Sequence, residues 1–71
     1  MPKLLSTKQI VKILEGNGFI FISQNGSHMK YRKVNGKVLT TIIPANKKEI
    51  PVGTLRSIIR QSGLRLDDFG I

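Results

Sequence analysis

The sequence predicts a small α+β domain in which two helices cover one face of a three-stranded antiparallel sheet. Apolar residues recur at helical spacing near each end of the chain, and β-branched runs between turn signals fill the middle. The length of 71 residues allows one hydrophobic core and no more. We therefore expect a single domain over residues 1–71, with the element order α-β-β-β-α.

The first helix is predicted over Ser6 to Glu15. Ser6 followed three residues later by Gln9 is a capping box, in which each side chain accepts a hydrogen bond from the other residue's backbone N–H. The segment 16–18 (Gly-Asn-Gly) ends the helix, because glycine and asparagine tolerate the left-handed conformation found past a helix C-terminus. The apolar face of this helix consists of Ile10, Ile13 and Leu14.

Three strands are predicted in the middle of the chain, over residues 19–22, 28–34 and 38–43. Turn-forming residues separate them, at 24–26 (Gln-Asn-Gly) and at Asn35-Gly36. The second of these is the strongest short hairpin signal, because both of its residues tolerate a positive φ. Pro44 ends the third strand, since proline has no N–H to donate to a sheet.

A second helix is predicted over Thr54 to Ser62, with Leu55, Ile58 and Ile59 on its apolar side. Its start stays open, because Pro51 and Thr54 both suit a helix N-terminus. Gly63 suits the position just past the end of the helix. The tail up to Phe69 is long enough for one more turn, which Phe69 would anchor.

Positive charge is the strongest functional signal in the composition. Twelve basic and four acidic residues give a formal net charge of +8. On a chain of this size, such a charge predicts a polyanionic partner, and nucleic acid is the common one. One tyrosine and no tryptophan leave few side chains for base stacking, so we expect contacts to the phosphate backbone rather than capture of splayed bases.

The composition also excludes several kinds of site. The absence of cysteine excludes disulfides, thiolate zinc sites and a cysteine nucleophile, and the single histidine excludes a site with two imidazoles from one chain. Asp67 and Asp68 are neighbours, which fits a helix-capping turn better than a metal pair. We expect no metal and no other cofactor. The N-terminus lacks the apolar stretch of a signal peptide, and no apolar run is long enough to span a membrane. We therefore expect a cytoplasmic protein without a membrane partner.

The second predicted strand carries the best candidate for chemistry. Residues two apart on a strand share a face, so His28, Lys30 and Arg32 point one way while apolar Met29 and Tyr31 point toward the helices. An imidazole exchanges a proton near neutral pH, and beside two cations it suits acid–base cleavage of a phosphodiester. The same alternation also fits a histidine that is merely an exposed surface residue without a catalytic role.

Other basic residues are candidate phosphate contacts. Arg56 and Arg60 lie one turn apart on the second predicted helix, and Lys47 and Lys48 lie in the loop before it. Both pairs also fit a solvated surface. From the residues alone, two alternatives to an enzyme stay open: a noncatalytic RNA-binding module, and a basic subunit that docks an acidic partner protein.

Four segments of the chain together match a known family pattern. They are residues 13–19 (Ile-Leu-Glu-Gly-Asn-Gly-Phe), Gly26-Ser27-His28 with Tyr31, Lys48-Glu49-Ile50, and residues 53–64 from Gly-Thr-Leu-Arg to Gly-Leu. In these segments the chain resembles the HicA family of mRNA interferase toxins from bacterial toxin–antitoxin pairs. The resemblance implies a double-stranded-RNA-binding-like α-β-β-β-α fold, cleavage of mRNA, His28 as the catalytic residue, and Ser27 beside it as an RNA-binding residue. It also implies a HicB antitoxin that masks the active face.

One position departs from the family pattern. Many members carry a second histidine two residues after the proline that ends the third strand, and Asn46 stands there in this chain. An amide donates a hydrogen bond but does not shuttle a proton. Asn46 therefore speaks against a two-histidine mechanism and leaves the role of His28 untouched. The hypothesis is metal-independent cleavage, with His28 as general base and with Lys30 and Arg32 stabilising the transition state. The group that protonates the leaving oxygen stays open among water, Lys30 and His28 itself.

Overall fold

The computed structural model describes residues 4–70. The order α-β-β-β-α predicted from the sequence is confirmed, with one short 3₁₀ helix added at the end. The elements are α1 (Thr7–Gly16), β1 (Ile20–Asn25), β2 (His28–Asn35), β3 (Lys37–Pro44), α2 (Val52–Ser62) and the 3₁₀ helix η1 (Leu66–Phe69). The targeting segment that we expect to be absent would begin in residues 1–3, which lie outside the described part.

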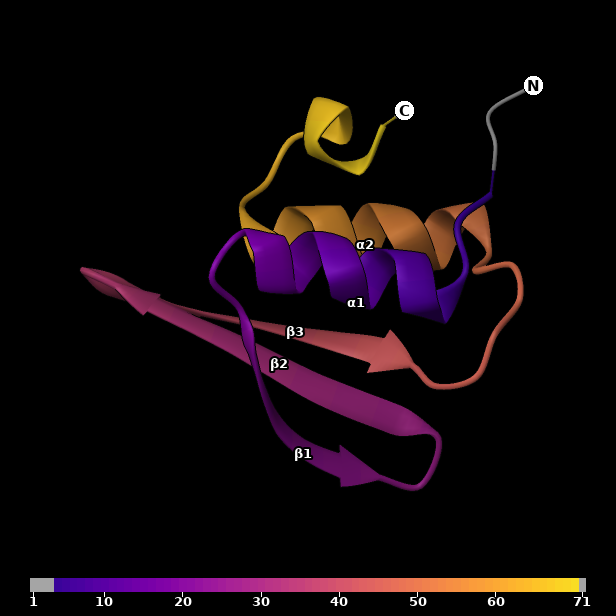
Figure 1. The fold of residues 1–71 in the computed structure, drawn as a ribbon, viewed down its shortest axis with the longest axis horizontal. Helices are drawn as coiled ribbons and strands as arrows, with labels where there is room; N and C mark the ends of the chain where they lie inside the picture. Colours follow the sequence, from indigo (N-terminus) through magenta and orange to yellow (C-terminus); the bar gives the residue numbers. More distant parts are fainter. Residues whose placement is uncertain (1–3, 71) are drawn as a thin grey trace.

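The two helices form one layer and the sheet forms the other, as the predicted α+β architecture requires. The strands are antiparallel in the order β1-β2-β3, and Figure 1 shows both helices on the same side of this sheet. The core lies between the layers, and Phe69 of η1 joins it, as expected for the anchored tail. Its fully buried apolar side chains are Phe19, Ile10, Leu14, Ile43, Ile50 and Ile58.

Local sequence explains most of the helix ends. Helix α1 ends at Gly16, and within the predicted stop at 16–18 only Gly18 has a positive φ, of 92°, while the cap residue Asn17 has a φ of −107°. The Gln9 N–H donates to Ser6 Oγ at 3.2 Å and the Ser6 N–H donates to Gln9 Oε1 at 2.9 Å, which confirms the capping box. Helix α2 begins at Val52, two residues before Thr54, because the extended Pro51 precedes its first turn and accepts from the Leu55 N–H at 2.9 Å. Gly63 ends α2 in the left-handed conformation, with φ of 69°.

The hairpin between β2 and β3 forms where Asn35-Gly36 predicts it. Its turn differs from the expected one, since Gly36 has a positive φ of 79° while Asn35 does not. Among the described non-glycine residues, Asn46 alone has a positive φ, of 57°, in the loop after β3. Asparagine is one of the few residue types that enter this region without much strain.

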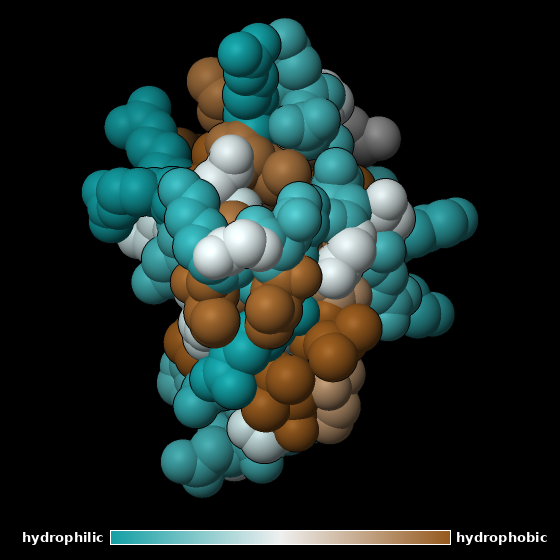
Figure 2. Space-filling view, turned by 90° about the vertical axis from the view of Figure 1, so that its left-hand side faces the viewer, coloured by the Kyte–Doolittle hydropathy of each residue, from teal (hydrophilic) through white to brown (hydrophobic). Residues whose placement is uncertain are grey.

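Strand β1 lies farthest from the helices (Figure 1). A bulge interrupts its pairing with β2 at Ile22, and all six of its residues are exposed. The apolar side chains of Ile20, Phe21 and Ile22 keep 62%, 50% and 39% of their surface in solvent. Figure 2 shows hydrophobic side chains gathered over the lower part of the molecule, where the sheet lies. The layer of two helices is thus too narrow to cover β1.

Candidate active site

The strand register assembles one continuous surface on the side of the sheet that the helices leave uncovered. Residues paired across antiparallel strands share a face. In β2 this face carries His28, Lys30 and Arg32, as the alternation predicted. We call this surface the open face; the residues paired with these three are Asn25, Ser23 and Ile20 of β1 and Pro44, Ile42 and Thr40 of β3.

His28 is the first residue of β2, and its side chain is exposed. It lies in a shallow hollow of about 400 Å³ on the open face. The other residues that line this hollow are Ser23, Asn25, Lys30 and Ile42. The imidazole therefore has free access to a ligand, with an ammonium group, a hydroxyl and an amide around it.

The two cations next to His28 along the strand are held differently. Lys30 is half-buried and lines the hollow together with His28. Arg32 lies one pleat further along the same face, where its Nε donates a hydrogen bond to Thr40 Oγ1 at 3.2 Å. This bond fixes the guanidinium across β3, so its remaining N–H groups can meet a phosphate that lies along the open face.

The turn before His28 is tied down on two sides. Gly26 has a φ of 62°, and its carbonyl accepts a hydrogen bond from Gln24 Nε2 at 3.0 Å. The Ser27 carbonyl accepts from the Ala45 N–H at 2.7 Å. These contacts set the position at which the strand starts, and with it the direction of the imidazole.

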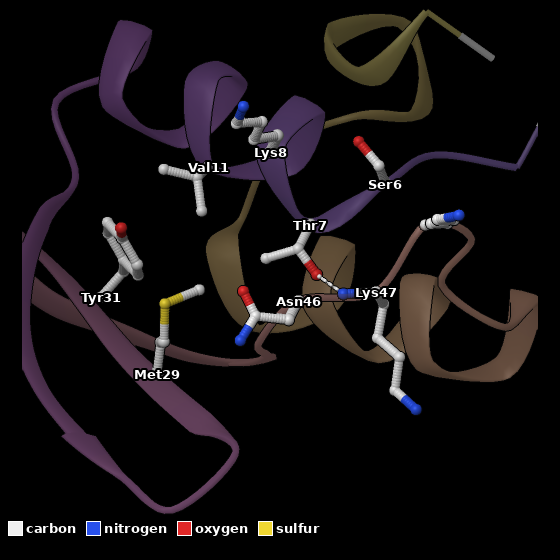
Figure 3. A pocket seen from close by; sticks show the side chains of 9 residues that line it. Ser6, Thr7, Lys8, Val11, Met29, Tyr31, Asn46 and Lys47 are labelled. Atoms are coloured by element: carbon white, nitrogen blue, oxygen red, sulfur yellow. Dashed lines mark hydrogen bonds between the residues drawn. The ribbon is translucent and has the colours of Figure 1, made fainter.

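The loop lysines lie apart from this hollow. Lys47 and Lys48 line a separate groove on the helix side of the sheet, shown in Figure 3. Thr7 attaches their loop to α1: its hydroxyl donates to the Pro44 carbonyl at 2.8 Å and accepts from the Lys47 N–H at 2.9 Å. The structure therefore places these two lysines on a different surface from Lys30 and Arg32.

Arg56 and Arg60 are exposed on α2 and line neither the hollow nor the groove. Their role as phosphate contacts stays a prediction. Ser23 and Asn25 are members of the hollow that the sequence reasoning missed. The signal was available, because a two-residue turn at Gly26-Ser27 places Asn25 opposite His28.

Within residues 4–70, no group of three or more His, Cys, Asp or Glu side chains is arranged to hold a metal ion. Asp68 serves a structural purpose, since its Oδ2 accepts the Arg65 N–H at 2.9 Å at the start of η1. This contact agrees with a capping turn at Asp67-Asp68. In the same part of the chain, neither helix has the length and apolar character needed to cross a membrane.

A comparison with known protein families shows to which family the chain belongs. A family model described as the HicA toxin of bacterial toxin–antitoxin systems matches residues 7–64. The chain belongs to the HicA toxin family. The matched part runs from the first residue of α1 to just past α2, so it contains the open face and the loop with Asn46. As a HicA toxin, the chain has an antitoxin as its implied partner. No curated protein matches the sequence.

Proposed function

We propose that this HicA toxin is an endoribonuclease that cleaves mRNA on its open face, with His28 as the general base. The observation that carries the proposal is the exposed imidazole of His28, the single histidine of the chain, in a hollow that it shares with Lys30. General acid–base catalysis by a positioned side chain typically contributes about 10²- to 10⁴-fold in rate. The membership in a toxin family supports a reaction that harms the host cell.

In the proposed reaction, the ribose 2′-oxygen attacks the adjacent phosphorus. His28 takes the 2′-hydroxyl proton while the new O–P bond forms and the bond from phosphorus to the 5′-oxygen breaks. The leaving 5′-oxygen takes a proton from water or from the Lys30 ammonium group. The products are a 2′,3′-cyclic phosphate and a 5′-hydroxyl, so the cleavage step is a transesterification in which no water is added across the broken bond.

Lys30 and Arg32 would stabilise the extra negative charge that the phosphate carries in the transition state. Both lie on the same side of β2 as His28, and the Thr40 hydroxyl holds the Arg32 side chain in place. Preorganised donors of this kind are effective because they need no reorganisation as charge develops. The net charge of +8 would attract the RNA over a longer range.

The antitoxin partner is proposed to be HicB-like and to cover the open face. A face with three basic or titratable side chains on β2 and exposed Ile20 and Ile42 beside them suits a partner with acidic and apolar surface. Such a partner would block the approach of RNA to His28 and so neutralise the toxin.

The decisive experiment incubates end-labelled RNA with the purified chain in EDTA, beside the variant His28→Ala. We expect the wild type to produce fragments with 2′,3′-cyclic phosphate ends, and the variant to bind the RNA without cutting it. Because His28 is exposed, the variant should keep the thermal unfolding midpoint of the wild type.

Each part of the proposal has its own contrary result. Full cleavage by the alanine variant would remove His28 from the mechanism. Cleavage that needs a divalent ion would remove the metal-free reaction. RNA binding without any new ends, in the wild type as well, would identify the chain as a binding module.

A further inference from the structure

The groove on the helix side of the sheet has no part in the reaction proposed above. It lies between the start of α1, the first half of β2 and the loop after β3 (Figure 3), and its volume is about 530 Å³. Its apolar wall comes from Val11 of α1 and from Met29 and Tyr31 of β2. Pockets of this size, with an apolar lining and a few polar groups, commonly bind small and largely apolar groups.

Two polar groups at the groove have no partner in the part of the chain that the structure describes. Tyr31 keeps only 4% of its surface in solvent, yet its hydroxyl makes no hydrogen bond there. No buried side-chain oxygen or nitrogen among the described residues lacks a partner, so this hydroxyl keeps contact with solvent, and Tyr31 is one of the residues that line the groove. The carboxamide of Asn46 also makes no such bond, and its backbone is held at a φ of 57°.

The rim of the groove is positively charged. Lys8 of α1 and Lys47 and Lys48 of the loop all line it, and all three are exposed. Among residues 4–70, no acidic residue lines the groove. The occupant that fits is therefore a group with a flat apolar part, hydrogen-bonding edges and negative charge on its flanks, which is the chemistry of a nucleotide within a single strand.

We propose that this groove binds one nucleobase of the RNA close to the scissile phosphate. The base would lie against Val11 and Met29, with the Tyr31 hydroxyl and the Asn46 carboxamide on its edge. An asparagine amide offers a donor and an acceptor side by side, which is how this residue reads adenine in other nucleic-acid complexes. Lys8 and Lys47 would hold the flanking phosphates. This inference rests on the proposed function, because it assigns a subsite to the same RNA.

The two surfaces meet at one end of the sheet. His28 and Met29 are successive residues of β2 that point to opposite faces. The hydrogen bond from Ala45 to Ser27 joins the turn before His28 to the loop that carries Asn46. An RNA strand that rounds this end of the sheet would pass from the hollow to the groove. The few aromatic residues of the chain led us to expect no capture of a base. In this groove the aliphatic side chain of Val11 and the thioether of Met29 would take the place of stacking aromatic rings.

The first experiment measures binding of short single-stranded RNAs that carry one abasic nucleotide at successive positions around the mapped cleavage site. The His28→Ala chain is used so that the RNA stays intact. We expect one position to weaken binding by up to about 5- to 150-fold, the range that corresponds to the loss of one base–aromatic stacking contact, while the others change it little. Equal effects at every position would overturn the proposal.

The second experiment uses substitutions with matched controls. Asn46→Gly suits the positive φ and removes the amide, and we expect it to abolish the preference among the four bases at the sensitive position. Lys8→Gln should weaken binding several-fold. Lys12→Gln is its control, because Lys12 lies one turn further along α1 beside Phe69, away from the groove. Variants that bind RNA like the control, or that lose affinity for an acidic antitoxin segment instead, would contradict the base site.

The two proposals can fail separately. Cleavage that depends on His28 without a position-specific base effect would leave the proposed function intact and reject the groove as a subsite. A position-specific base effect in a chain that never cuts RNA would support the groove and reject the enzyme.

Discussion

The backbone N–H of Ala45 donates a hydrogen bond to the carbonyl oxygen of Ser27, with 2.7 Å between the nitrogen and the oxygen. The bond joins the turn that precedes His28 to the loop that contains Asn46. The hollow on the open face and the groove on the helix side therefore share one corner of the sheet, although their side chains point in opposite directions. Changes to this corner should affect both surfaces together.

Gly26 tests the importance of that corner. Its φ of 62° is unfavourable for a residue with a Cβ, while a Cβ there would meet no atom within 4 Å. Gly26→Ala should therefore cost about 1 kcal/mol of unfolding free energy through the backbone alone, and should slow cleavage by shifting His28. Denaturant unfolding and single-turnover cleavage measure the two effects.

Gly16→Ala is the matched control. Gly16 is the last residue of α1, it has no positive φ, and a Cβ there would also meet nothing within 4 Å. Alanine should raise stability by up to about 1 kcal/mol at this position and leave cleavage unchanged. If both variants lose the same stability, the conformation of Gly26 is not the cause.

The cations of the open face should determine the salt dependence of RNA binding. Replacing a lysine that contacts a phosphate lowers the slope of log K against log salt by about one and weakens binding to all sequences alike. We expect this result for Lys30→Gln. Lys12→Gln on the outer side of α1 should keep the wild-type slope, and identical slopes for the two variants would remove Lys30 from the RNA interface.

Tyr31 should remain protonated to unusually high pH. Burial, and after it the negative charge of Glu15, raises the pKa of the Tyr31 hydroxyl above its ordinary value. The chain has one tyrosine, so the absorbance of tyrosinate during an alkaline titration reports on it alone. The midpoint in the folded chain should exceed that in urea, and Glu15→Gln should remove the smaller part of the difference. Equal midpoints in the folded and unfolded chains would disprove the shift.

The same shift predicts a loss of stability in alkali. The unfolded chain releases the tyrosine proton at a pH of about 10, before the folded chain does. The contribution of Tyr31 is thus complete below that pH and declines as the pH rises toward the folded-state pKa. Tyr31→Phe has no hydroxyl to titrate, so its stability should fall less steeply over this range. Parallel curves for the two proteins would contradict the linkage.

Gln61 should contribute more to the free energy of unfolding than an exposed side chain usually does, because it joins α2 to β3. Its Oε1 accepts hydrogen bonds from Thr41 Oγ1 at 3.0 Å and from the Ile42 N–H at 3.2 Å. Thr41 is fully buried, so Gln61→Ala leaves its hydroxyl unsatisfied, at a cost of about 1–3 kcal/mol.

A double-mutant cycle in chemical denaturation checks this assignment. Thr41→Val alone should change stability little, since the exposed Gln61 side chain can turn to water. In the double variant it should restore part of what Gln61→Ala loses. Strict additivity of the two substitutions would show that the pair does not interact.

The sequence was sufficient to predict features that depend on local rules. The capping box at Ser6 and Gln9, the left-handed Gly63 and the outward direction of His28 follow from short-range hydrogen bonding, backbone sterics and strand alternation. The Asn35-Gly36 dipeptide predicted the hairpin but not its conformation, because the register of the flanking strands also constrains the turn.

Features that depend on long-range packing could not be predicted from the sequence. The apolar run at 20–22 looks like any strand of a core. Phe21, paired with Tyr31 on the helix side, is half-exposed because two helices cover only part of the sheet, and Ile20 is exposed because it lies on the open face. The groove exists because Thr7 binds the loop after β3, a contact across 40 residues that no local pattern announces. The same contact separates Lys47 from His28, although the sequence reasoning grouped them by charge alone.

The uncovered first strand has a consequence for handling the toxin without its antitoxin. A sheet edge with three apolar side chains is a template on which copies of a chain can aggregate. The interrupted ladder at Ile22 and the mutual repulsion of molecules with a charge of +8 both oppose that aggregation. Added salt screens the electrostatic repulsion but does not weaken the attraction between the exposed apolar side chains of β1. Salt added to release bound RNA should therefore also favour precipitation of the free toxin.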